Sequence, residues 1–338
     1  MIKNLRKNAI ILLFVSFIVL FCVLKDDFRS IIDNLLMINP WWGIVALISS
    51  LLYIFFKALV LFDTVKEEIK NYTLLDAVKH TLKTQFFNGI TPFSSGGQPM
   101  EIYMIHKRGI RIPKATNLIM QNFIFYQVAL VLFGILAVII NGIFHYFKEV
   151  KLLKYFVVLG FCVNTFVLLF LFIVSFSKKS NEYLLKKAIT FFNKIKIVKD
   201  KEKTLEKWKD RLEDFHESAS QLRKNKRLFI KGVSYNFFAL IFLYVVPLFV
   251  IYSIVGMNVD ISIVEAIISS AYVLIIGSFV PIPGASGGIE YGFIAFFGNF
   301  IKGAVLSATL LLWRFITYYL PMILGAICFS LDKGEKEI

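Results

Sequence analysis

The stretch Thr91-Pro92-Phe93-Ser94-Ser95-Gly96-Gly97-Gln98-Pro99-Met100-Glu101 interrupts a chain that consists mostly of long apolar runs. A similar stretch, Val280-Pro281-Ile282-Pro283-Gly284-Ala285-Ser286-Gly287-Gly288-Ile289-Glu290, lies near the other end. Each contains a proline, then Ser-Gly-Gly, then a glutamate. Non-helical backbone at membrane depth is tolerated only where protein buries it or where it lines a cavity. Gly/Pro breaks at corresponding positions in two halves of a membrane chain predict a binding site between the halves.

The composition is that of a membrane protein. The 338 residues are 57% hydrophobic and 18% charged, and the mean hydropathy is +0.70. A soluble domain is about half apolar and about a quarter charged. A helix needs about 20 apolar residues to cross a bilayer. We therefore predict an all-α polytopic membrane protein, a single transmembrane domain over residues 1–338, with about six spanning helices near 9–24, 41–62, 117–140, 152–176, 228–255 and 303–331.

The distribution of charge predicts the orientation in the membrane. Lysine and arginine exceed acidic residues by 38 − 23 = 15, and the segment 177–231 alone holds 17 basic and 8 acidic residues. Positively charged loops stay in the cytoplasm. We expect both termini to lie there too, with the first apolar run kept as a helix because no small-residue cleavage site follows it. The basic excess favours attraction to anionic lipid over nucleic-acid binding.

The two broken segments predict hairpins and a repeat. Residues about 73–106 have basic flanks on both sides, which predicts a re-entrant hairpin from the inside. Residues about 261–300 would form a second hairpin, entered from the outside. Two separate spans remain an alternative there, because Asp260 and Lys302 give little charge bias. Repeat 1, about 41–140, and repeat 2, about 228–331, are then candidate inverted repeats.

Within the basic loop, apolar residues recur every three or four positions. This spacing predicts a helix with one apolar seam, formed by Leu205, Trp208, Leu212, Phe215, Ala219 and Leu222. We expect the helix to pack on a helix over 184–195 or to lie on the membrane surface. A dimerising coiled coil is the alternative, although only about two heptads are present.

The Ser-Gly-Gly turns predict helix starts that could bind an anion. A proline such as Pro99 suits a first helical turn, and free amides there, with the helix dipole, favour an anion such as a phospholipid head group. The candidate binding residues of the turns are Ser95, Gly96, Gly97, Gln98, Ser286, Gly287 and Gly288. The alternative is that the glycines only permit sharp turns and close helix packing.

Three charged residues complete the candidate site. Glu101 and Glu290 follow their turns at matched places, where capping of a helix is the simpler role. Arg314 lies 314 − 303 = 11 residues into the last apolar run, about 16 Å along a helix and so near the membrane midplane. An arginine there needs a partner, which a glutamate or a lipid phosphate would provide.

Other chemistry is not indicated. Cys22, Cys162 and Cys328 lie far apart inside apolar runs, and the four histidines are scattered, so we predict no metal and no cofactor. No set of nucleophile, base and orienting residue can be assembled, which argues against catalysis by this chain alone. No Gly-Lys-Ser/Thr follows the glycines, so the turns are not nucleotide loops.

The sequence resembles the lysylphosphatidylglycerol synthase transmembrane (flippase-like) family over nearly its whole length. Similar motifs are Ser95-Gly96-Gly97-Gln98-Pro99-Met100-Glu101 followed by Lys107-Arg108-Gly109, and Pro281-Ile282-Pro283-Gly284 followed by Glu290. An arginine in the last long helix, such as Arg314, fits as well. Full-length relatives join this membrane region to a soluble lysyltransferase domain, for which we expect no room in a chain that ends at Ile338.

The resemblance implies flipping of a phospholipid across the cytoplasmic membrane. The lipid would be lysylphosphatidylglycerol or another anionic or aminoacylated lipid, and in the family such lipids resist cationic peptides and antibiotics. Two alternatives stay open. One is a phosphatidylglycerol lysyltransferase, which would involve tRNA; the other is a structural or docking membrane subunit. The expected partners are membrane phospholipid, a separate lipid-modifying enzyme, or a second copy of the chain.

Overall fold

The computed structural model describes residues 28–146, 151–194, 200, 202, 204–206, 208, 225–278 and 280–332. The described residues form helices and no strands. Five helices are long and apolar enough to cross a membrane, and they span 40–65, 112–144, 155–173, 226–255 and 303–331. These match five of the six predicted spans. The sixth, near 9–24, lies outside the described residues, as does most of the predicted seam from Leu212 to Leu222.

The first half starts with a short helix and a long one. Helix α2 (Phe28–Leu36) lies between the first two predicted spans, where no helix was predicted, and it packs on α14. Helix α3 (Pro40–Val65) begins where the Asn39 side chain accepts a hydrogen bond from the Trp41 amide, with Pro40 in the first turn. A proline is tolerated there because its missing N–H would have no helical partner.

A helical hairpin follows α3. Helix α4 (Leu74–Gly89) leads into the 3-10 turn η1 (Pro92–Ser94), and α5 (Gly97–Lys107) runs back. Thr73 and Asp76 form a capping box at the start of α4. In such a box each side chain bonds the other residue's amide, so two unsatisfied donors of the first turn gain acceptors.

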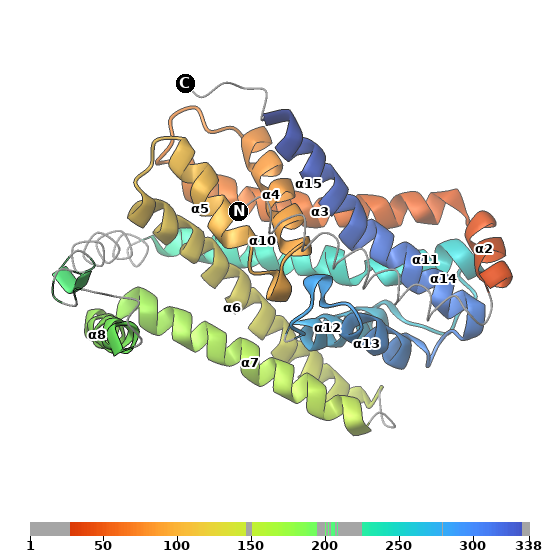
Figure 1. The fold of residues 1–338 in the computed structure, drawn as a ribbon. Helices are drawn as coiled ribbons and strands as arrows, with labels where there is room; N and C mark the ends of the chain where they lie inside the picture. Colours follow the sequence, from red (N-terminus) through yellow and green to blue (C-terminus); the bar gives the residue numbers. More distant parts are fainter. Residues whose placement is uncertain are drawn as a thin grey trace.

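The middle of the chain contains two long helices and a crossing one. Helix α6 (Ile112–Phe144) packs beside α7 (Lys151–Phe176), and α8 (Lys178–Lys194) follows directly. In Figure 1, α7 runs across the view whereas α8 is seen nearly end-on at one end of α7. The predicted helix near 184–195 is therefore present and begins earlier, at Lys178.

The second half repeats the order of the first. Helices α10 (Lys226–Tyr244) and α11 (Val246–Val255) are followed by a hairpin of α12 (Ile263–Gly277), η2 (Pro283–Ala285) and α13 (Gly288–Phe297). A capping box of Ser262 and Glu265 starts α12, as Thr73 and Asp76 start α4. The last run comprises α14 (Gly303–Arg314), the π-helical turn Phe315–Tyr319 and α15 (Leu320–Leu331).

The two hairpins approach each other tip to tip in the middle of the molecule (Figure 1). Turns η1 and η2 are in contact, and η2 also contacts α4. In each half the hairpin is preceded and followed by a long apolar helix. This order agrees with the predicted repeats. The inverted orientation and the re-entrant insertion stay predictions.

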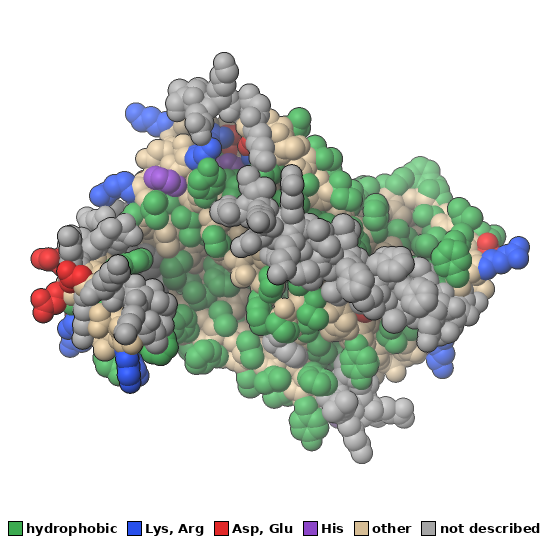
Figure 2. Space-filling model, in the orientation of Figure 1, with side chains coloured by type: hydrophobic (Ala, Val, Ile, Leu, Met, Phe, Trp, Pro, Cys, Tyr) green, Lys and Arg blue, Asp and Glu red, His purple; other side chains and the backbone are tan. Residues whose placement is uncertain are grey.

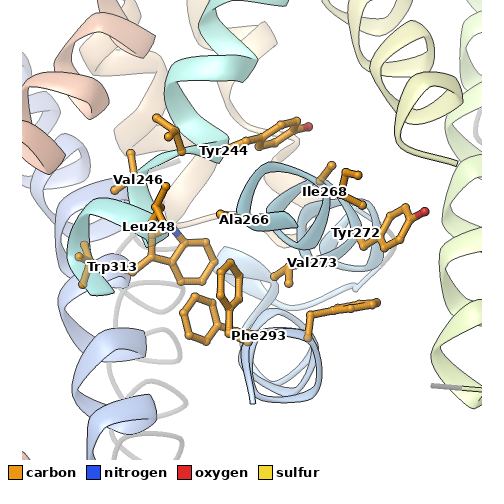
Figure 3. Packing of buried hydrophobic residues seen from close by; sticks show 14 of the residues in the cluster. Tyr244, Val246, Leu248, Ala266, Ile268, Tyr272, Val273, Phe293 and Trp313 are labelled. Carbon is orange, nitrogen blue, oxygen red and sulfur yellow. The ribbon is translucent and has the colours of Figure 1, made fainter. Parts of the chain in front are cut away.

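Among the described residues, the largest apolar core lies mainly in the second half and also takes in residues of α6. Residues of α10 to α14 pack around α12, and Figure 3 shows Trp313 and Phe293 close together there. Their ring centroids are 4.7 Å apart and nearly parallel. The outer faces are apolar as well, since α7 exposes Phe166 and Leu169 by more than half. Among the residues coloured in Figure 2, hydrophobic side chains lie over much of the middle of the face, and the charged ones lie toward its edges.

Candidate functional site

The two hairpin tips begin with the same backbone turn. In η1 Pro92 precedes two residues with positive φ, Phe93 at 53° and Ser94 at 51°. In η2 Pro283 precedes two more, Gly284 at 65° and Ala285 at 51°. Ser-Gly-Gly then opens α5 in one hairpin and α13 in the other. The tips thus share the conformation of this turn, whereas the Ser-Gly-Gly segments differ, since φ is −82° at Gly96 and +89° at Gly287. The two tips touch each other.

Arg314 lies next to the place where the two tips meet, and its side chain is only 5% exposed. Its Nε is 3.0 Å from Oε1 of Glu290, and its Nη2 donates a 2.9 Å hydrogen bond to the Gly284 carbonyl. The Nε–Oε1 contact is an ion pair by distance, without the alignment of a hydrogen bond. The guanidinium also lies 4.4 Å from the centre of the Tyr318 ring, within range of a cation–π contact. The predicted pairing of Arg314 with a glutamate is therefore seen with Glu290.

Glu290 has two roles in this arrangement. Its Oε1 faces Arg314, and its Oε2 accepts a 2.6 Å hydrogen bond from the Gly287 amide at the start of α13. Its carboxylate thus lies where the helix dipole and free amides favour a negative charge. Capping and ion pairing, which the sequence offered as alternatives, occur together.

Tyr318 connects the two hairpins. Its hydroxyl donates a 2.8 Å hydrogen bond to the Gly89 carbonyl at the end of α4. The same hydroxyl lies so close to Gly284 of η2 that a Cβ there would be 2.3 Å away. Tyr318 belongs to the π-helical turn that follows Arg314, and π-turns are found often at functional sites. Sequence reasoning missed Tyr318, although its position four residues after Arg314 places both on one helix face.

The amides of the first tip already have partners inside the hairpin. The Gly96 amide donates to Oγ1 of Thr91 at 2.8 Å, and the Gly97 amide donates to Oδ1 of Asn88 at 2.9 Å. The expectation that these two amides are free for an anion is therefore corrected, because neighbouring side chains satisfy them. Asn88 and Thr91 were missed from the sequence, although both residue types are common acceptors at helix starts.

The two serines bond within their own turns. Ser95 donates from Oγ to the Pro92 carbonyl at 2.9 Å, and Ser286 donates to the Pro283 carbonyl at 3.2 Å. Ser95 is exposed and Ser286 is buried. Gln98 is half-buried in the first turn of α5. Gly288 opens α13, where a Cβ would meet Val280 at 2.4 Å, so this glycine is required for close packing.

Glu101 lies apart from Arg314. It is buried, accepts a 3.0 Å hydrogen bond from Thr84 and interacts electrostatically with Lys57. Lys57 itself lies 4.1 Å from the centre of the Tyr126 ring. Glu101 follows the second glycine of its turn by four residues, and Glu290 follows its own by two. The two glutamates are therefore not at matched places, and Glu101 belongs to a second charged cluster on α3, α4, α5 and α6.

A family comparison agrees with this architecture. The family described as the lysylphosphatidylglycerol synthase TM region matches residues 8–325. The chain belongs to this family. The match includes both hairpin tips and Arg314, and with the five long apolar helices it shows a multi-pass membrane protein. A relative named as a UPF0104 membrane protein, from Archaeoglobus fulgidus, is 28% identical over 276 residues, or 75% of this chain and 76% of the relative.

Proposed function

We propose that this family member moves a phospholipid head group across the cytoplasmic membrane, with both chain ends in the cytoplasm. The observation that supports this most is the Arg314–Glu290 ion pair, buried where the two broken hairpins meet. Buried charges at membrane depth are costly and usually serve a function. A guanidinium is also well suited to phosphate, because its donors match two phosphate oxygens at once.

In this proposal Glu290 stands in for the lipid phosphate. Its carboxylate neutralises Arg314 and caps α13 at the same time. A phosphate that enters between the tips would replace it on Arg314 and on the Gly287 amide. The charge of Arg314 is then balanced both with and without lipid. The displaced carboxylate of Glu290 needs a cationic partner in its place, which the amine of an aminoacylated lipid would provide.

The arrangement of the hairpins supports alternating access, in which the lipid site opens first to one side of the membrane and then to the other. The tips touch each other, and Tyr318 joins both of them. If the hairpins enter from opposite faces, as the charge pattern predicts, movement of one hairpin would open the site to one side only. Fixed sites between repeats that move against each other are typical of membrane transporters. The family description favours lysylphosphatidylglycerol or another anionic or aminoacylated lipid as the substrate.

The test is a flipping assay in vesicles. Purified protein is reconstituted with acyl-labelled phosphatidylglycerol or its lysyl derivative, and a membrane-impermeant quencher reports the lipid that reaches the outer leaflet. We expect fast translocation by the wild type, a loss of at least about tenfold in Arg314→Ala, and partial retention in Arg314→Lys. Lys302→Ala removes an exposed lysine and is the matched control.

Two further results separate the alternatives. Equal rates in wild type and Arg314→Ala, with both proteins helical and monodisperse, would overturn the proposed site. No translocation by the wild type, together with lysyl transfer from lysyl-tRNA to phosphatidylglycerol, would favour the transferase that the family description names. If the protein shows neither translocation nor lysyl transfer, the remaining alternative is a structural or docking subunit.

A further inference from the structure

Helix α8 is basic and amphipathic. Its 17 residues carry a single glutamate and five lysines, which are Lys178, Lys179, Lys186, Lys187 and Lys194. Only Ser177 separates it from α7, whose residues 155–173 are apolar enough to cross a membrane. Figure 1 shows the axis of α8 lying across that of α7. A basic amphipathic helix that crosses the end of a spanning helix in this way is typical of the membrane surface.

One exposed face of α8 alternates aromatic and basic side chains. Tyr183, Lys187, Phe191 and Lys194 follow each other at intervals of four, four and three residues, which places them on one face. We call these four residues the α8 stripe. Tyr183 is 63% exposed, Phe191 is 59% exposed, and both lysines are exposed. By contrast Ile189, on another face of the helix, is 5% exposed.

Within the stripe, lysine and aromatic side chains are close neighbours. The Lys187 ammonium lies 5.7 Å from the centre of the Tyr183 ring. Aromatic rings are enriched at the level of lipid head groups, and lysines near that level are attracted to anionic lipids. Lysine is depleted from the cores of protein–protein interfaces. The composition of the stripe thus fits a membrane surface better than a protein partner.

We propose that the α8 stripe binds the head groups of anionic phospholipids in the leaflet where α7 ends, and that it selects them over zwitterionic lipids. The two lysines contact the phosphates, and the rings of Tyr183 and Phe191 lie among the head groups. The proposal stands independently of lipid flipping, because α8 packs on α7 and lies away from the hairpin tips (Figure 1).

Energy transfer from α8 to labelled lipids tests this proposal. Thr190 is exposed beside the stripe, so Thr190→Cys carries the donor fluorophore in a chain whose Cys22, Cys162 and Cys328 are changed to serine. The full chain is placed in nanodiscs with acyl-labelled phosphatidylglycerol or phosphatidylcholine, which keep their natural head groups. The ratio of transfer to the two lipids measures the enrichment of the anionic lipid around α8.

We expect enrichment of phosphatidylglycerol at low ionic strength and its decline as salt screens the charges. Neutralising Lys187 and Lys194 together, as Lys187→Gln/Lys194→Gln, should bring the ratio close to one, with a loss of up to about fivefold per lysine. The exposed control Lys302→Gln should leave the ratio unchanged. A wild-type ratio near one, or a ratio that survives the double substitution, would overturn the proposal.

Discussion

Arg314 is held by a carboxylate, a carbonyl and an aromatic ring, and these come from three separate elements. Glu290 belongs to α13, Gly284 to η2 and Tyr318 to the π-turn. A buried arginine with all three partners is fixed in place, and each partner depends on it in turn. Loss of the guanidinium would leave the carboxylate of Glu290 buried without its counter-charge.

We therefore expect Arg314→Ala to destabilise the protein by about 3 to 5 kcal/mol, the usual cost of leaving one member of a buried ion pair alone. Adding Glu290→Gln should recover part of the loss, because the remaining side chain is then neutral. Melting temperatures in detergent for the two single variants and the double variant give the coupling energy. Strictly additive effects would mean that the pair does not act as one unit.

Gly284 has a conformation and surroundings that exclude a larger residue. Its φ is +65°, and a Cβ would lie 2.3 Å from the Tyr318 hydroxyl. We expect Gly284→Ala to lower stability by at least about 1 kcal/mol, since both backbone strain and a clash oppose it. Gly142→Ala is the matched control, because Gly142 lies in α6 with open space around it. There alanine should be neutral or stabilise the helix, as thermal melting of both variants can show.

Sequence reasoning at this scale found the charged residues but not all their contacts. An arginine in an apolar run must have a partner, so the pairing of Arg314 could be anticipated. Which of the two glutamates pairs with Arg314 could not be anticipated. The distance from glycine to glutamate differs by two residues between the hairpins, so the two glutamates are not equivalent. The internal partners of the Gly96 and Gly97 amides depend on where the α4 end folds back, which no local pattern encodes.

An acidic residue, Asp76, stabilises the start of helix α4. Asp76 accepts hydrogen bonds from the amide and the hydroxyl of Thr73 and forms a 2.7 Å ion pair with Arg108 at the end of α5. Burial alone would raise the pKa of Asp76, but the bonds from Thr73 and the charge of Arg108 outweigh it and lower the pKa from 3.8 to about 2. Asp76 thus joins both ends of the first hairpin.

This lowered pKa predicts that the stability of the protein depends on pH in the acid range. A carboxylate whose pKa is depressed by folding contributes stability above its unfolded pKa and loses it as the pH falls toward the folded pKa. The contribution of Asp76 is therefore complete above about pH 4 and disappears between pH 3.8 and about 2. Asp76→Asn should lower stability by about 1 to 2 kcal/mol at neutral pH and by progressively less in that window. Melting temperatures of both proteins against pH measure this; a constant difference would contradict it.

The elements themselves were largely predictable where apolar runs are long. Five predicted spans are present, and both hairpin breaks fall at the quoted glycine and proline residues. The short helix α2 was missed, because nine residues with mixed polarity carry a weak signal. The π-turn at Phe315–Tyr319 was missed as well. One extra residue within a continuous apolar helix leaves the hydropathy unchanged, so composition cannot reveal it.

For the whole molecule, the proposed topology places the two hairpins on opposite sides of the membrane. Asn71 and Gly109 flank the first hairpin, and Met257 and Lys302 flank the second. In a cysteine-free background, single cysteines at Asn71 and Gly109 should react with an impermeant maleimide only from the cytoplasmic side. Cysteines at Met257 and Lys302 should react only from the outside. Labelling of both pairs from one side would contradict the inverted arrangement.

The position of the tips discriminates between a hairpin and two spans in the second half. If 261–300 is re-entrant, a cysteine at Ala285 lies at membrane depth against the first tip, and an impermeant reagent should react slowly from either side. If the segment spans the membrane twice, the same cysteine should react rapidly from the cytoplasm. Sequence charge could not decide this, because Asp260 and Lys302 nearly cancel.

The two tips begin with the same turn but are closed by different chemistry. Asn88 and Thr91 close the first tip with neutral oxygens, whereas Glu290 closes the second with an ionisable one. A carboxylate also carries a charge, which Arg314 balances here, whereas an amide or hydroxyl oxygen carries none. The second tip is therefore held by an ion pair as well as by a hydrogen bond. An anion that competes for Arg314 can release the second tip, whereas the bonds of the first tip yield only to another hydrogen-bond donor or acceptor.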